Sequence, residues 1–103
     1  RFFRQDQIIK NICVFYNIKE TLIKGPKRDS YLVKARQIAM YILKNDLSLS
    51  FVEIGNILGG RDHTTIMHGV GKIEKLLVNK NFSEEMLGIK SLLKNGGENQ
   101  RSV

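Results

Sequence analysis

The sequence is poor in the residues that form covalent cross-links and membrane spans. Cys13 is its only cysteine, so no internal disulfide can form, and the chain fits a reducing compartment. No stretch approaches the roughly 20 consecutive apolar residues of a membrane-spanning helix, and we find no signal peptide. We therefore expect a cytoplasmic chain. Because it starts at Arg1 rather than methionine, we also expect a fragment of a longer protein.

Residues typical of catalytic or metal sites are also scarce. His63 and His68 are the only histidines. Their five-residue spacing separates them by about 140° around a helix, so they cannot share a metal ion as a pair four residues apart would. Cys13 has no histidine near it in the sequence, and no glycine-rich phosphate-binding loop precedes a lysine. The sequence thus predicts no enzyme, no metal site and no cofactor in this chain.

Acidic residues are the minority charge. The chain of 103 residues has 17 Lys and Arg and 10 Asp and Glu, which gives a net charge of +7. Residues 1–36 hold nine of the basic residues and three acids, a balance of +6, against +1 for residues 62–103. A basic surplus gathered in one third of a chain favours a polyanionic partner, although charge alone does not say which one.

Helical periodicity is abundant and predicts one all-α domain. With 42% hydrophobic residues, the chain can bury a modest core without disulfides or metal. We expect about five or six helices in a domain over residues 5–95, between a linker end (residues 1–4) and a disordered tail (residues 96–103). The expected boundaries are a cap at Asp6, a turn or short helix over 17–23, and a helix over 31–44 capped by Asp29 or Ser30. A further helix should begin at Asp62 or His63 and run to about Asn79, and a last helix should be capped by Ser83 and stop at Gly96-Gly97.

The segment over residues 50–79 predicts a helix-turn-helix. Ser50 and Glu53 match a capping box, in which the two side chains each accept from a backbone N–H of the first turn. The short first helix ends at Gly59-Gly60, a typical C-cap, and Asp62 suits the N-cap of the second helix. In this motif the N-terminal residues of the second helix meet base edges in the major groove. The inner stripe of the second helix is apolar and consists of Ile66, Val70, Ile73 and Leu77.

Two glycines, Gly69 and Gly71, lie inside the second helix. Each costs about 1 kcal/mol relative to alanine in a helix interior. A helix that carries this cost gains something from a bare backbone. The two interpretations are tight packing against another helix and close approach to another surface.

A basic loop is predicted from Lys24 to Ser30, because Gly25 and the only proline, Pro26, interrupt any helix. Three basic side chains fall within five positions of this loop. Further basic and polar side chains open the helix that follows. Such a cluster is often only a solvated face, but beside a helix-turn-helix we interpret it as a contact for the polyanion.

Two segments together resemble a known family. The run from Gly59 to Glu74, with its Gly-Gly-Arg-Asp-His-Thr-Thr core, resembles the signature of the C-terminal DNA-binding domain of the bacterial replication initiator DnaA. The basic loop followed by Ala35 to Tyr41 resembles the corresponding loop and helix, and the resemblance extends to about Leu93. It implies a Trp-repressor-like helix-turn-helix fold and a monomeric domain of the bacterial cytoplasm, associated with the nucleoid. Its partner would be double-stranded DNA at the replication origin, in AT-rich boxes resembling TTATNCACA. ATP is implied only for the missing part of the parent chain, and acidic phospholipid is a further candidate partner near the N-terminal end.

The resemblance also assigns roles to residues. A loop arginine, Arg28, would enter the AT-rich minor groove, where a narrow groove has an enhanced negative potential. The residues assigned to base edges in the major groove are Asp62, His63, Thr64 and Thr65. The residues assigned to backbone phosphates, which fix register without reading sequence, are Lys24, Lys27, Lys34, Arg36, Gln37, Arg61, His68 and Lys72. Asp62 stays open as a plain N-cap, and His68 stays open as a plain surface histidine.

The sequence departs from the family pattern at three positions. Ser30 replaces a basic residue of many members, which predicts weaker phosphate affinity, and Gly69 and Gly71 are smaller than the usual residues, which predicts a looser or more deeply seated helix. Val52 would be the apolar residue that touches a thymine methyl group.

Two other functions remain open: a helix-turn-helix transcriptional repressor, and a module that docks on anionic membranes or on proteins.

Overall fold

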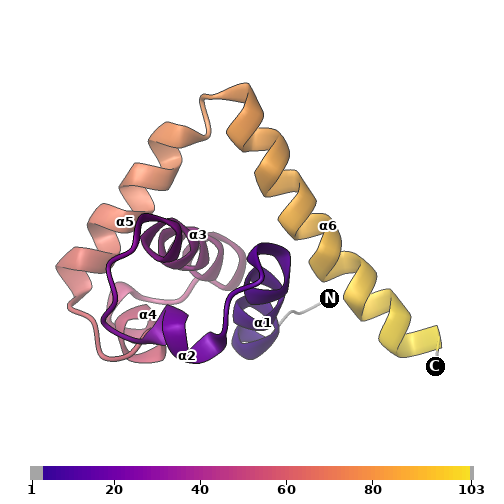
Figure 1. Cartoon of the computed structure of the whole chain (residues 1–103), viewed down its shortest axis with the longest axis horizontal. Coiled ribbons are helices and arrows are strands. Elements are labelled where there is room, and N and C mark those ends of the chain that lie inside the picture. Colours follow the sequence, from indigo (N-terminus) through magenta and orange to yellow (C-terminus); the bar gives the residue numbers. More distant parts are fainter. Residues whose placement is uncertain (1–3, 103) are drawn as a thin grey trace.

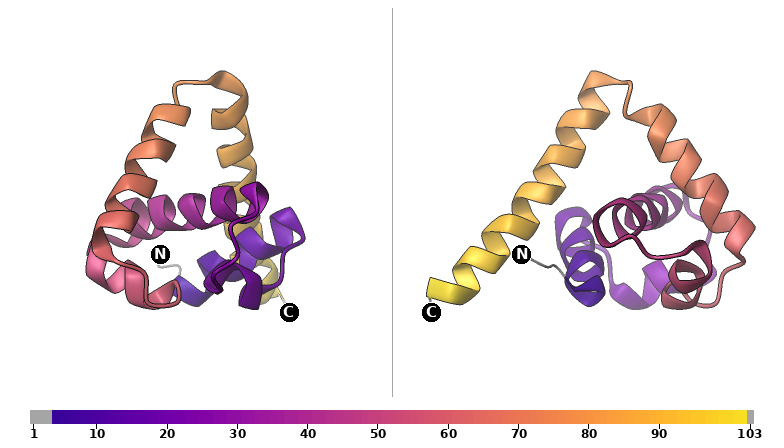
Figure 2. Two further views of the ribbon diagram at one scale, coloured as in Figure 1. Left: turned by 60° about the vertical axis from the view of Figure 1, so that its left-hand side comes forward. Right: turned by 180° about the vertical axis from the view of Figure 1, so that it is seen from behind.

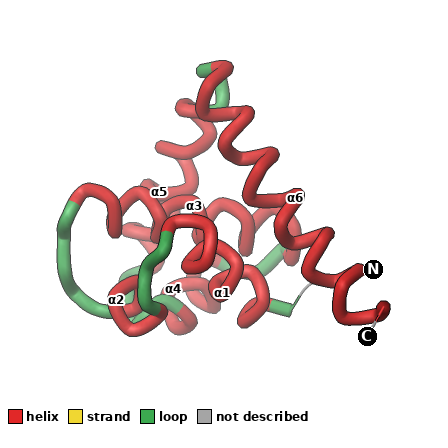
Figure 3. Tube along the Cα trace, turned by 45° about the vertical axis from the view of Figure 1, so that its right-hand side comes forward, coloured by secondary structure: helices red, strands yellow, loops and turns green. Residues whose placement is uncertain are grey.

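Six helices account for most of the residues that the structure describes. The computed structural model describes residues 4–102, with side chains for residues 4–93. The helices are α1 (Gln5–Tyr16), α2 (Glu20–Lys24), α3 (Ser30–Leu47), α4 (Phe51–Ile57), α5 (His63–Leu76) and α6 (Lys80–Ser102). Short loops join them, and the described residues contain no strand (Figure 3), which confirms the predicted all-α fold. Residues 1–3 of the predicted linker and Val103 of the predicted tail lie outside the described residues. The division of the chain into linker, domain and tail stays a prediction.

The helix α3 lies at the centre of the fold. It packs against α1, α2, α4 and α5. The helices α5 and α6 meet at a turn and diverge like the limbs of a V, with α3 between them (Figure 1). The far end of α6 reaches beyond the other helices (Figure 2). Because α3 has neighbours on several sides, its buried residues surround much of the helix: Leu32, Ala35, Arg36, Ile38, Ala39, Met40, Ile42 and Leu43.

The core is aliphatic and fixes the orientation of α5. Its fully buried side chains include Ile8, Ile12, Leu32, Ile38, Ile42, Ile54, Leu58, Ile66 and Ile73. Burial of a side chain of this size contributes about 1.5–3 kcal/mol. The predicted apolar stripe of α5 is confirmed for Ile66, Val70 and Ile73, which are buried, whereas its fourth member, Leu77, is the C-cap residue and is only partly buried. With this stripe turned inward, the opposite side of α5 is held at the surface.

The predicted start of the helix-turn-helix is confirmed in detail. Ser50 Oγ accepts from the Glu53 backbone N–H at 3.0 Å, and Glu53 Oε1 accepts from the Ser50 backbone N–H at 2.8 Å. The bond that the carboxylate accepts from the Ser50 backbone N–H, followed by a hydrogen bond from the Ser50 side chain, lowers the pKa of the Glu53 carboxyl, because both favour its charged form. At the second helix, Asp62 occupies the N-cap as predicted and accepts from the Thr64 backbone N–H at 3.0 Å.

The first and third helices begin differently from the sequence prediction. The residue at the N-cap of α1 is Arg4, so Asp6 lies inside the first turn and does not cap the helix. Asp29 takes the N-cap position of α3 but its side chain makes no capping bond. The helix continues three residues past the predicted end at Lys44, to Leu47, because its apolar side stays in contact with the core.

The ends of α5 and α6 also differ from the prediction. The helix α5 stops three residues before Asn79, and α6 starts directly after it, because the Asn79 side chain accepts from the Phe82 backbone N–H at 3.0 Å. Ser83 is therefore inside the helix, and its hydroxyl donates to the Leu77 carbonyl at 2.5 Å. The stop predicted at Gly96-Gly97 is wrong, since α6 runs to Ser102. Glycine costs a helix about 1 kcal/mol per residue, which weakens it without forbidding it. None of the described helices combines the length and the apolar content that a membrane span requires.

Candidate nucleic-acid interface

The turn between α4 and α5 is built from glycine backbone. Gly59 and Gly60 have φ angles of 80° and 82°, a left-handed conformation that glycine adopts without strain. The backbone N–H groups of Gly60 and Arg61 both donate to the Gly55 carbonyl at 2.9 Å. A Cβ atom on Gly55 would collide with the Arg61 carbonyl oxygen. The turn therefore holds the start of α5 directly against α4.

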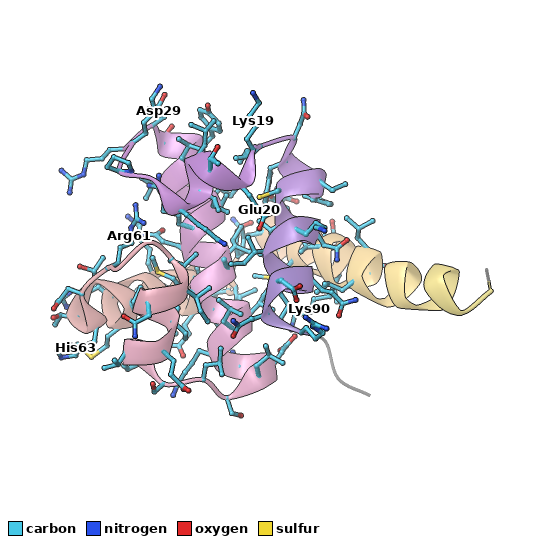
Figure 4. The ribbon with its side chains drawn as sticks, turned by 90° about the horizontal axis from the view of Figure 1, so that it is seen from below. Lys19, Glu20, Asp29, Arg61, His63 and Lys90 are labelled. Carbon is cyan, nitrogen blue, oxygen red and sulfur yellow. The ribbon has the colours of Figure 1, made fainter. Side chains whose placement is uncertain are left out.

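The N-terminal end of α5 presents polar side chains to solvent. Asp62, His63, Thr64 and Thr65 are all exposed, and His63 points outward from the molecule (Figure 4). The Asp62 carboxylate accepts from the Thr64 hydroxyl as well as from its backbone N–H, and these two bonds lower the pKa of Asp62. His63 Nδ1 lies 3.7 Å from Asp62 Oδ1. The four residues predicted to read bases thus share one exposed helix end, and the N-cap role of Asp62 is confirmed.

The basic loop lies beside this helix end, and Arg61, which directly precedes Asp62, contacts the base of the loop. The Arg61 guanidinium donates through Nη2 to the Gly25 carbonyl at 2.5 Å and through Nη1 to the Lys24 carbonyl at 3.4 Å. Nη1 also donates to the Leu58 carbonyl at 2.6 Å, at the end of α4. In Figure 4, Arg61 lies between Asp29 at the end of the loop and His63 at the start of α5. Burial lowers the pKa of the Arg61 guanidinium, which nevertheless stays charged.

A second arginine supports the same loop from inside the fold. Arg36 is only 4% exposed, and it donates to the Ile23 carbonyl through Nε at 2.7 Å and to the Leu22 carbonyl through Nη2 at 2.9 Å. Its burial, followed by the nearby charge of Arg61, lowers the pKa of the guanidinium. The structure therefore gives Arg36 a bracing role that the sequence did not predict.

A surface cavity of about 230 Å³ joins the predicted DNA contacts from three elements. The loop contributes Arg28, α3 contributes Gln37, the turn before α5 contributes Arg61, and the first turn of α5 contributes Thr65. The remaining lining residues are Pro26, Val33, Arg36 and Met40. The side chain of Arg28 is exposed. Residues far apart in the sequence thus form one surface beside α5.

Lys34 lies apart from this surface. Its ammonium pairs with the Glu85 carboxylate of α6 at 3.2 Å and sits 5.5 Å from the centre of the Phe82 ring. The same carboxylate accepts from the Tyr16 hydroxyl at 2.5 Å. Desolvation, and then this bond to Glu85, raises the pKa of Tyr16. Lys34 therefore helps to hold α6 against α1 and α3.

The other predicted phosphate contacts lie at the surface. Lys24 pairs with Glu20 at 3.8 Å within α2, while Lys27 is exposed in the loop and His68 and Lys72 are exposed along α5. Val52, the residue expected to touch a thymine methyl group, is 59% exposed on α4.

The two glycines inside α5 have different surroundings. Gly69 is buried where α5 crosses α3: a Cβ atom there would collide with the Met40 sulfur and lie 3.3 Å from Gln37 Cγ. Tight helix packing is therefore the confirmed explanation for Gly69. A Cβ atom on Gly71 would meet open space. Sequence reasoning missed Gly55, whose signal was a glycine inside the apolar pattern of a short helix.

The fold and this surface define a helix-turn-helix domain with a basic loop fixed beside its second helix. The described residues contain no group of three or more His, Cys, Asp and Glu side chains that could hold a metal ion. Residues 5–73 match the model of the family described as bacterial DnaA protein helix-turn-helix. The chain belongs to this family, as its two sequence signatures predicted.

Individual relatives agree with the family match. The chain is 44% identical over 84 residues to the chromosomal replication initiator protein DnaA of Ureaplasma parvum, which covers 82% of this chain and 18% of that relative. It is 47% identical over 70 residues to the protein of the same name from Thermomicrobium roseum, and the match covers 68% of this chain and 15% of that relative. The protein of the same name from Roseiflexus castenholzii is 35% identical over 91 residues, and the match covers 87% of this chain and 19% of that relative. The chain spans less than a fifth of the length of these relatives.

Proposed function

We propose that this domain binds double-stranded DNA in a sequence-specific manner, with α5 in the major groove and the basic loop in the adjacent minor groove. The observation that carries the proposal is the juxtaposition of the exposed start of α5 and the exposed Arg28 around one cavity. A helix of this kind fits the major groove. An arginine reaching beside it fits the narrow minor groove of AT-rich DNA.

The roles within the interface follow from the chemistry of the exposed groups. Asp62 can accept from a cytosine amino group, and Thr64 and Thr65 can donate or accept while their methyl groups meet thymine methyl groups. His63 is placed at the same helix end. Residues around this centre would bind phosphates and fix the register: Lys24, Lys27, Gln37, His68 and Lys72. Lys34 would reach phosphate only by giving up its ion pair with Glu85.

The proposed target is an AT-rich box resembling TTATNCACA at a bacterial replication origin. The relatives carry the name chromosomal replication initiator protein, which supports a role in initiation for the longer protein. In that protein this domain would supply DNA recognition in the bacterial cytoplasm, and the steps that depend on ATP would use other segments. For the domain alone we propose a monomer that needs no cofactor to bind DNA.

The test is fluorescence anisotropy with a labelled box duplex and a scrambled duplex of equal composition at near-physiological salt. We expect a preference for the box of about 10³-fold or more. Equal and steeply salt-dependent binding to both duplexes would overturn the proposal, because it would leave only a non-specific basic surface. Binding to anionic vesicles that survives loss of His63 and Thr64 would instead indicate membrane docking. Strongest capture of genomic fragments outside the origin would indicate a transcriptional repressor.

Arg28→Ala tests the minor-groove contact within the same assay. Loss of a base-reading contact should weaken box binding by about 1–3 kcal/mol and relax the preference at the AT-rich end. Lys10→Ala is the matched control, because Lys10 is exposed on α1 and lies outside the proposed interface. Equal weakening on every duplex would make Arg28 a phosphate contact instead.

A further inference from the structure

The two proposed DNA-reading elements belong to different parts of the chain. Arg28 lies in the loop between α2 and α3, and the polar residues that open α5 begin at Asp62. To enter neighbouring grooves of one duplex together, these elements must keep a fixed separation. A loop arginine on a mobile loop would instead lose binding energy to the ordering of the loop. The fold therefore needs a link between the loop and the start of α5.

Arg61 has the contacts of such a link. It directly precedes the N-cap Asp62, and its guanidinium donates to Lys24 and Gly25 at the base of the loop and to Leu58 at the end of α4. Two of these three bonds, to Gly25 and Leu58, are no longer than 2.6 Å between heavy atoms. Both terminal nitrogens are thus directed toward backbone carbonyls of the fold. A planar guanidinium can serve carbonyls on two segments at once, which the single ammonium group of lysine cannot reproduce with the same geometry.

Two further contacts show that the loop base is clamped as a unit. A Cβ atom on Gly59 would collide with the Lys24 carbonyl, so the turn of the helix-turn-helix touches the same peptide that Arg61 binds. Arg36 takes the two preceding carbonyls, those of Leu22 and Ile23. Four successive carbonyls thus accept from two guanidinium groups, at the point where α2 ends.

We propose that Arg61 is a positioning residue that sets the separation between Arg28 and the start of α5, and that it acts through the loop rather than by binding a phosphate. This role replaces the phosphate contact that the family resemblance assigned to it. The consequence for DNA reading rests on the proposed function, since it requires Arg28 to reach the minor groove. The link itself is a property of the protein without DNA and can be measured separately.

The DNA test uses Arg61→Lys, which keeps the positive charge and removes the planar fork. We expect Arg61→Lys to lower box binding about 10-fold and to relax preference at the AT-rich end, as Arg28→Ala does. The double variant should bind no worse than the weaker single variant, because both changes remove the same contact. The dependence of affinity on salt should match that of the unchanged protein.

A phosphate role for Arg61 predicts different results in the same experiment. Arg61→Lys would then keep most of the affinity, and Arg61→Ala would weaken all duplexes equally and lower the salt slope by about one. Additive losses in the double variant with Arg28→Ala would also overturn the proposal.

The protein test measures a distance distribution between spin labels at Lys27→Cys and Met67→Cys, two exposed positions on the loop and on α5. Cys13→Ala removes the only other thiol. Arg61→Lys should broaden this distribution and leave unchanged a control pair at Lys10→Cys and Leu87→Cys on α1 and α6. An unchanged loop distribution overturns the inference. If Arg61→Lys broadens the distribution but the unchanged protein shows no preference for the box, the positioning role of Arg61 is supported and the proposed function is rejected.

Discussion

The base and the tip of the basic loop use arginine in opposite ways. At the base, Arg36 and Arg61 are directed into the fold and donate to backbone carbonyls. At the tip, Arg28 is exposed, and we find no hydrogen bond or ion pair from it to the other described residues. The three residues contribute equally to the net charge of the sequence. The net charge of the chain therefore indicates how strongly it attracts a polyanion. The place of each arginine in the fold decides whether that arginine is available to bind the polyanion.

The arginines at the base answer a need created by a short helix. The helix α2 has five residues, so its last carbonyls lack partners within the helix. These carbonyls also carry the negative end of the helix dipole, which favours a cation beside them. Two guanidinium groups bind the carbonyls of the last three residues of α2, from Leu22 to Lys24, and that of the following Gly25. Part of the basic surplus therefore stabilises the framework on which the exposed loop stands.

The largest effect that would test this comparison is on stability. Replacing Arg36 with methionine keeps much of its apolar stem but leaves the Leu22 and Ile23 carbonyls without their guanidinium partner. Each lost charge-assisted bond at a buried site costs about 1–3 kcal/mol, so the loss of two such bonds in Arg36→Met should lower the free energy of unfolding by about 2–6 kcal/mol. The measurement is the midpoint of urea unfolding, followed by circular dichroism.

Arg28→Met is the matched control for that experiment. It removes the same charge from an exposed site, so its unfolding midpoint should stay close to that of the unchanged protein. Equal midpoints for Arg36→Met and Arg28→Met would contradict the division between bracing and exposed arginines.

The parts of the fold that depend on local pattern were predictable from the sequence. The capping box at Ser50 and Glu53 and the N-cap at Asp62 involve neighbours in the chain, and the stripe of α5 follows from periodicity. The role of Arg36 was not predictable, because it depends on where α2 ends relative to α3. Among these residues, contacts could be predicted from the sequence only where the two partners are close neighbours in the chain.

The same limit applies to the helix ends and to the candidate site. Ser83 looked like a cap because small hydroxyl residues favour that position, but Asn79 precedes the helix and satisfies its first turn. The residues at the exposed end of α5 were identified by their motif. The pairing of Lys34 with Glu85 of α6 joins residues 51 apart, and no local signal indicates it.

The two glycines of α5 also differ in whether they face the fold or open space, and this difference should affect packing. Both changes to alanine gain up to about 1 kcal/mol of helix propensity. At Gly69 the added methyl group meets Met40 and Gln37, and such overpacking costs about 1–3 kcal/mol. Gly71→Ala should therefore be more stable than Gly69→Ala by about 1–3 kcal/mol, measured as the difference in urea unfolding free energy. Similar stabilities for the two variants would mean that α3 and α5 separate easily at Gly69.

The smallest effect concerns Asp62. This residue both supports the fold, because it caps α5, and faces the proposed DNA site. Its bonds from Thr64 lower its pKa below 3.8, the value for the unfolded chain. A lowered pKa means that the carboxylate stabilises the fold above the unfolded value and that this contribution is lost as pH falls through the lower folded value. Asp62→Asn should remove this dependence, so the unchanged protein should lose unfolding free energy relative to Asp62→Asn as the pH falls from about 5 through the lowered folded pKa.

Asp62→Asn also separates the two roles at neutral pH. Asparagine is as good an N-cap as aspartate, so the exposed end of α5 should keep its structure and the unfolding midpoint should change little. If the carboxylate also accepts from a cytosine amino group, the preference for the box over the scrambled duplex should fall while binding to both rises, since a negative charge facing phosphates has been removed. An unchanged ratio of the two dissociation constants, measured by anisotropy at fixed salt, would make Asp62 a cap alone. Base reading would then rest on His63, Thr64 and Thr65 in α5, together with Arg28 in the loop.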